Sequence, residues 1–112
     1  MTEFNNELEV TNREVLVREF DQQLARTVEK LRTVNLHKLE GQEFAMKFYA
    51  LTQDLADASL RDSWQSEIQV PHLNPTTFAD QLLVLGMELL KGGNTRSLSA
   101  LTDRLLEFRK SL

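Results

Sequence analysis

The scarcity of helix-breaking residues constrains the fold of this chain more than any other feature. In 112 residues there are two prolines, which lie close together, and four glycines: Pro71, Pro75, Gly41, Gly86, Gly92 and Gly93. The long stretches between them are free to form helices. No segment shows a sustained alternation of apolar and polar residues, and no Asn-Gly or Asp-Gly hairpin turn occurs. The sequence therefore predicts an all-α fold.

Helical periodicity divides the chain into four predicted helices. Each carries apolar side chains three or four residues apart, which is the spacing of one helix face. The four stripes are Val17, Phe20, Leu24, Val28 and Leu31; Phe44, Phe48, Leu51 and Leu55; Phe78, Leu82, Leu85 and Leu89; and Leu98, Leu101, Leu105, Phe108 and Leu112. Amphipathic helices with short connections pack around a shared core, so we expect a four-helix bundle with mostly antiparallel neighbours.

Local signals indicate the limits of the first helix. Thr11 is followed three residues later by a glutamate, the spacing of a capping box, so the first helix is expected to begin there. Residues 1–11 would then form a loose, flexible segment, and residues 12–112 a single helical-bundle domain. The helix is expected to end near Val34, or at Gly41 if it continues.

The other helices also have start and stop signals. The second is expected to begin near Gln42 and to pass Trp64. It must end before Pro71, because the residue ahead of a proline is biased away from helical geometry. Asn74 is a strong N-cap, and the proline after it has its φ angle preset for the third helix. That helix is expected to end in a left-handed cap at the glycine pair 92–93, and the asparagine or threonine that follows would cap the fourth.

Composition and charge limit the class of protein. Hydrophobic residues make up 41% and charged residues 27%, as in ordinary globular domains. The longest apolar run, residues 82–87, is far shorter than the roughly 20 residues of a membrane span. The absence of cysteine favours a reducing compartment, so a cytoplasmic protein is predicted. A net charge of −4 without a basic stripe argues against nucleic-acid binding.

Chemical motifs are not evident. The two histidines, His37 and His72, lack the glutamate three residues earlier that di-iron bundles use, so no metal site and no cofactor are predicted. There is no nucleophile elbow and no phosphate-binding loop, so no residue is assigned a catalytic role.

One enzymatic or ligand-binding interpretation stays open. Tyr49, Trp64 and His72 could surround an internal pocket of the bundle, with His72 as a general base. This interpretation requires their polar groups to converge on one point. The alternative is that His72 lies in a surface loop and that Trp64 closes one end of the bundle.

The third helix is unusually apolar. Beside its core stripe it carries Leu83, Met87 and Leu90, and Val84 interrupts its polar side, so the apolar arc covers about 200°. Gly86 would let a neighbouring backbone approach closely. A helix of a four-helix bundle has only a limited inward face, so we expect these side chains to form a homodimer interface. The alternative is that the first or second helix covers them.

These observations favour a non-catalytic helical interaction or regulatory module. Its broad apolar faces would bind a second copy of the chain or a helix of a protein partner. The alternative is a small-molecule-binding or enzymatic bundle that uses the pocket residues.

Overall fold

The computed structural model describes residues 2–60, 74–92 and 97–112, and every regular element in these ranges is helical. The predicted all-α fold is therefore confirmed. In chain order the elements are α1 (Thr2–Thr33), α2 (Leu36–Leu39), α3 (Gln42–Leu60), the 3-10 turn η1 (Pro75–Thr77), α4 (Phe78–Lys91) and α5 (Leu98–Lys110).

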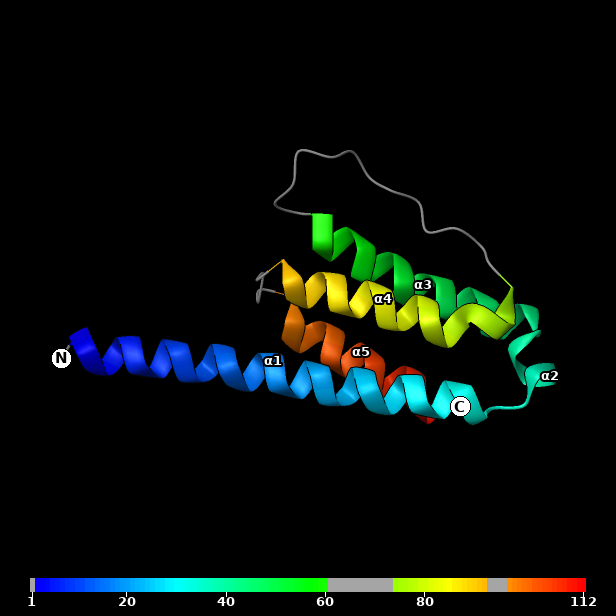
Figure 1. Ribbon diagram of the computed structural model, residues 1–112, viewed down its shortest axis with the longest axis horizontal. Coiled ribbons are helices and arrows are strands. Elements are labelled where there is room, and N and C mark those ends of the chain that lie inside the picture. Colours follow the sequence, from blue (N-terminus) through cyan, green and yellow to red (C-terminus); the bar gives the residue numbers. More distant parts are fainter. Residues whose placement is uncertain (1, 61–73, 93–96) are drawn as a thin grey trace.

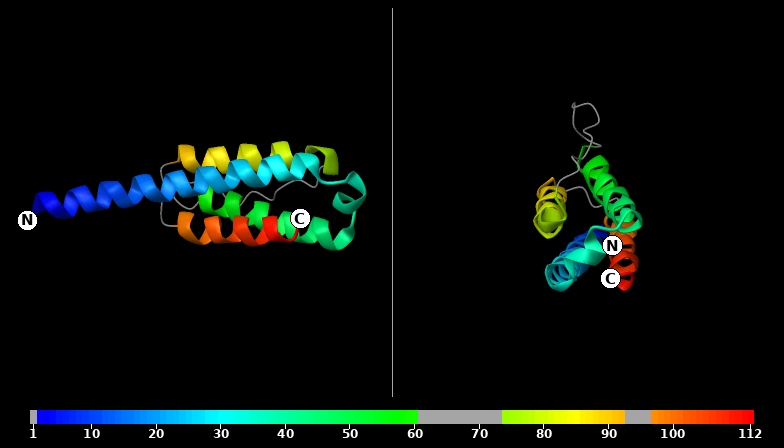
Figure 2. Two further views of the ribbon diagram at one scale, coloured as in Figure 1. Left: turned by 90° about the horizontal axis from the view of Figure 1, so that it is seen from below. Right: turned by 90° about the vertical axis from the view of Figure 1, so that its right-hand side faces the viewer.

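The four long helices form a bundle that is square in cross-section (Figures 1 and 2). Both α1 and α3 pack against α4 and α5, so α1 faces α3 across one diagonal and α4 faces α5 across the other. The expected antiparallel packing holds for α1 with α4 and for α3 with α5, whereas α1 with α5 and α3 with α4 run parallel (Figure 1). The parallel pairs arise because α3 reverses the direction of α1 across one diagonal and α5 reverses that of α4 across the other, whereas α4 keeps the direction of α3.

Helix α1 begins earlier than the sequence predicts. Thr11 lies inside the helix rather than at its start, because no glycine or proline interrupts the chain between residues 2 and 33. The N-terminal part of α1 projects beyond the ends of α4 and α5 (Figure 2), and the molecule is elongated, at 56 × 30 × 18 Å. The predicted end near Val34 is confirmed, and Asn35 then caps the short α2 by accepting a 2.8 Å hydrogen bond from the His37 amide.

Two of the remaining predicted boundaries are confirmed. Helix α3 begins at Gln42, and the Asn74 side chain accepts a 3.0 Å hydrogen bond from the Thr76 amide at the start of η1. Gly92 follows α4, but its φ of −71° is right-handed, so it does not form the predicted left-handed cap. The extension of the second helix through Trp64 and the caps proposed at Gly93, Asn94 and Thr95 lie outside the described residues.

The predicted apolar stripes form the core. All of their members are buried except Val17, Leu85 and Leu112, which are partly buried and pack against the rest. The rings of Phe48 and Phe78 stack with centroids 4.1 Å apart and link α3 to α4. Phe108 adds α5 to this cluster, with its ring centroid 6.1 Å from that of Phe48.

Three threonines lie in the core without disrupting it. The Thr27, Thr52 and Thr102 hydroxyls each donate to the carbonyl four residues earlier, at 2.7, 3.2 and 2.7 Å. A buried hydroxyl without a partner would cost about 1–3 kcal/mol. The local hydrogen bond removes this penalty, so each threonine can serve as a small core residue.

Gly86 is the point of closest approach between α4 and α1. A β-carbon built at this position would lie 2.4 Å from Cδ2 and 3.1 Å from Cγ of Leu24. The close neighbour predicted at Gly86 is therefore present, but it is the Leu24 side chain rather than a backbone. Because Leu24 is itself buried in the core, it has little space into which to move.

Gly86→Ala should therefore destabilise the fold by about 1 kcal/mol, since overpacking of about 1–3 kcal/mol exceeds the gain in helix propensity of about 1 kcal/mol. Urea unfolding measures this difference. Gly92→Ala is the matched control and should be neutral or stabilising, because a β-carbon there meets its nearest atom at 3.6 Å. The same comparison in a Leu24→Ala background tests the cause. If Gly86→Ala then lowers the free energy of unfolding no more than Gly92→Ala does, the clash with Leu24 explains the original loss. An unchanged loss of stability would contradict this explanation.

Candidate interaction surface

Helix α4 presents apolar side chains both to the core and to solvent. Phe78, Leu82 and Leu89 on its inner side are 0–1% exposed. On the opposite side Val84 is 59% exposed and Met87 is 50% exposed. These two residues are three positions apart and therefore neighbours on one helix face. The part of the chain that the structure describes thus leaves Val84 and Met87 of α4 exposed.

The other two predicted interface residues lie in a different environment. Leu83 and Leu90 are partly buried and pack against the core. Other described residues of the chain therefore cover Leu83 and Leu90 in part. They leave Val84 and Met87 exposed to solvent. Leu83 and Leu90 form the margin of the exposed pair, and a charge placed on either would disturb the core as well as the surface.

Two charged residues lie at the ends of the exposed pair. Asp80 and Lys91 are exposed, and the order Asp80, Val84, Met87, Lys91 has steps of four, three and four residues, so all four lie on one face. We call these four residues the α4 outer stripe. The Asp80 carboxylate also accepts a 2.8 Å hydrogen bond from Arg32 of α1, which ties this end of the stripe to the neighbouring helix.

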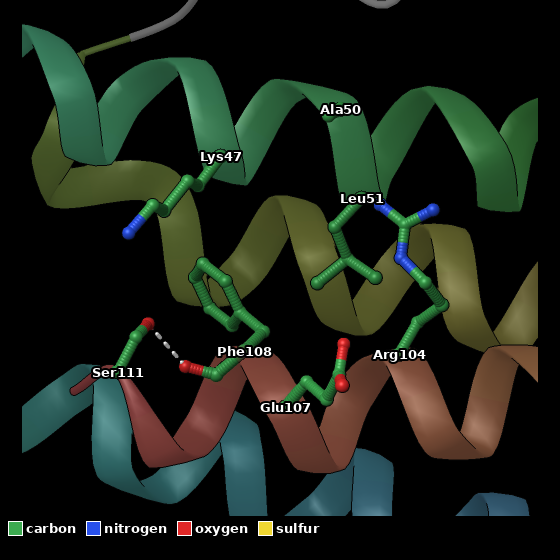
Figure 3. Close-up of a pocket in the computed structure, with 7 residues that line it drawn as sticks. All are labelled: Lys47, Ala50, Leu51, Arg104, Glu107, Phe108 and Ser111. Carbon is green, nitrogen blue, oxygen red and sulfur yellow. Dashed lines mark hydrogen bonds between the residues drawn. The ribbon is translucent and has the colours of Figure 1, made fainter.

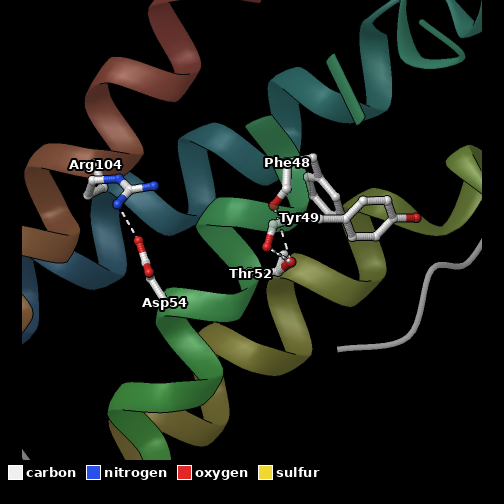
Figure 4. Close-up of polar contacts among 5 residues, drawn as sticks. All are labelled: Phe48, Tyr49, Thr52, Asp54 and Arg104. Atoms are coloured by element: carbon white, nitrogen blue, oxygen red, sulfur yellow. Dashed lines mark hydrogen bonds and ion pairs between the residues drawn. The ribbon is translucent and has the colours of Figure 1, made fainter. Parts of the chain in front are cut away.

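The predicted pocket residues are only partly described. The Tyr49 ring packs edge-on against Phe48 (Figure 4) and against Phe78, with ring centroids 5.6 Å apart in each case. Its aromatic body therefore belongs to the margin of the core. Trp64 and His72 lie outside the described residues, so the pocket of these three residues stays a prediction.

A surface groove of about 290 Å³ lies along the line where α3 and α5 meet (Figure 3). Leu51 and Phe108 provide its apolar lining, and the charged groups around it are balanced by ion pairs. Arg104 pairs with Asp54 (Figure 4), and the Lys47 ammonium lies 3.9 Å from the Glu43 carboxylate. With Glu107 also in the lining, the groove offers no net positive charge to an anion.

A second groove, of about 370 Å³, lies where the end of α1 meets α2 and η1. Its lining is mainly apolar, and Leu36 remains 43% exposed. Its single cation, Arg32, is already paired with Asp80. The groove therefore has a surface for an apolar group but no charged group free to orient a ligand.

Chemical sites of other kinds are not evident in the part of the chain that the structure describes. His37 is exposed. Among the described residues, no three histidine or carboxylate side chains lie close enough together to hold a metal ion. None of the described helices combines the length and the apolar character needed to cross a membrane. Comparison with known proteins finds no matching family model, no similar curated protein and no similar solved structure.

The two sides of α4 should differ sharply in their contribution to stability. Leu82→Ala empties a fully buried position and should lower the free energy of unfolding by about 2–5 kcal/mol. Met87→Ala changes a half-exposed side chain and should alter it by less than about 0.5 kcal/mol. Unfolding in urea at low protein concentration tests both. A large loss for Met87→Ala under these conditions would show that Met87 supports the fold of the single chain.

Proposed function

We propose that this chain is a non-catalytic helical interaction module that self-associates through the α4 outer stripe. The observation that carries the proposal is the solvent exposure of Val84 and Met87, side by side on a helix whose other face is fully buried. Val84 and Met87 form a small exposed apolar patch between two charged residues, which a protein partner can cover. Neither the groove between α3 and α5 nor the groove beside α2 has polar side chains arranged to bind or convert a ligand.

The size of this surface sets the expected strength of association. Burying the exposed halves of Val84 and Met87 in both copies would contribute about 4–6 kcal/mol. Association itself costs about 4–15 kcal/mol in lost freedom of motion. The exposed pair alone therefore cannot give a tight dimer, and the margins at Leu83 and Leu90 must add to the contact. We therefore expect a weak dimer that forms only at high protein concentration, because a micromolar dissociation constant would require about 8 kcal/mol of net binding free energy.

We also propose a cytoplasmic location. The chain contains no cysteine in 112 residues, so nothing in its stability depends on an oxidising compartment. A helix of another protein is the alternative occupant of the same surface, because an apolar pair at helical spacing suits either partner.

Light scattering coupled to size exclusion, over a concentration series, tests self-association directly. The expected mass rises towards twice 12.9 kDa as the concentration increases. Met87→Glu should shift the protein to the monomer, because it places a charge at the centre of the stripe. Met46→Glu is the matched control: Met46 is 68% exposed on α3, away from the stripe, and its replacement should leave the mass unchanged.

The opposite results have clear meanings. A mass of 12.9 kDa at every concentration would contradict self-association, and the partner helix would then be the occupant to seek. A dimer that survives Met87→Glu but not Met46→Glu would move the interface from α4 to α3.

A further inference from the structure

The α4 outer stripe has the same spacing in both directions along the helix, with its two charges exchanged. Its steps of four, three and four residues are symmetric, and its order is acid, apolar, apolar, base. Reversing the helix therefore places Lys91 where Asp80 was and Met87 where Val84 was. This symmetry matters because a two-fold axis perpendicular to a helix performs this reversal.

We propose that two copies of this chain pair through α4 in an antiparallel, two-fold arrangement. Val84 then meets Met87 of the partner subunit at the centre, and Asp80 meets Lys91 of the partner subunit at both ends. The inference rests on the proposed self-association and adds its geometry. All four side chains are exposed in the single chain, so none has to leave the core to make these contacts.

The charges select this orientation over the parallel one. A parallel pair would set Asp80 against Asp80 of the partner subunit and the two copies of Lys91 against each other. It would also align the two helix dipoles, whereas the antiparallel pair opposes them. Exposed ion pairs add little affinity, but like charges in contact discriminate against a wrong arrangement. The apolar centre thus drives association and the ends set its direction.

Two features of the chain support this geometry. Arg32 donates to the Asp80 carboxylate at 2.8 Å, so the acid is positioned before the partner arrives, although the guanidinium offsets part of its charge. Leu83 and Leu90 are seven residues apart and so share one margin of the stripe. A two-fold axis brings the same margin of both copies to one side, where these partly buried leucines extend the apolar contact.

Disulfide trapping tests the register, because the chain has no cysteine of its own. Asp80→Cys and Lys91→Cys chains are each oxidised mildly, alone and as a mixture, and the products are identified by intact mass. The antiparallel pair predicts a mixed disulfide in the mixture and little cross-linking of either chain alone. Efficient cross-linking of each chain with itself would establish the parallel pair and overturn the proposal.

Charge exchange gives a second test that leaves the apolar centre intact. Asp80→Lys and Lys91→Glu should each weaken self-association at least about fivefold, measured by analytical ultracentrifugation, because each sets like charges together at both ends. An equimolar mixture of the two variants should associate like the native protein, since every end contact is again attractive. Thermal unfolding of the dilute Asp80→Lys variant controls for the contact with Arg32 that this variant loses.

The results separate this inference from the proposed function. If the native protein is monomeric at all concentrations, both are wrong. If Met87→Glu abolishes the dimer but the mixture of charge variants stays dissociated, self-association through α4 stands and the antiparallel register is wrong.

Discussion

The stack of Phe48 on Phe78 is the contact on which the rest of the bundle depends. It joins α3 to α4, two parallel helices, through rings only 4.1 Å apart, and Phe108 brings α5 to the same cluster. Helix α1 is added from the other side, where Leu24 occupies the space that Gly86 leaves open. The aromatic cluster fixes the relative heights of three helices, and the glycine fixes how closely the fourth can approach. With α4 held in this way on both sides, its outer stripe is presented on a rigid support.

Sequence periodicity predicts which side of each helix is buried, because this depends only on local spacing. The stripe from Phe20 to Leu31 and its three counterparts were recoverable for that reason. Periodicity does not say which helix an apolar face will meet, so the diagonal relation of α1 to α3 could not be foreseen. For the same reason the sequence grouped Leu83 with Met87 beside the core stripe of α4, although Leu83 packs against the core while Met87 is half exposed. The start of α1 was missed because a capping box permits a helix start without requiring one.

The function proposed for this chain follows from a surface rather than from a cavity. The two grooves described above have their cations paired, as Arg104 is with Asp54, and so they lack charged groups free to bind a ligand. The outer stripe instead combines an apolar centre with opposite charges at its ends. Such a surface can recognise its own copy, because one set of side chains supplies both halves of every contact.

The diagonal arrangement also has a consequence for how the protein is made. The helices that flank α1 are α4 and α5, and α3 packs against the same two. On the ribosome, α1 and α3 emerge before either partner exists, so faces such as that of Phe20 and Leu24 have nothing to bury against. The bundle can close only after most of the chain has been translated, in a late and concerted step. The nascent chain therefore carries an exposed apolar surface for much of its synthesis, and molecular chaperones that shield such surfaces would bind it during this interval.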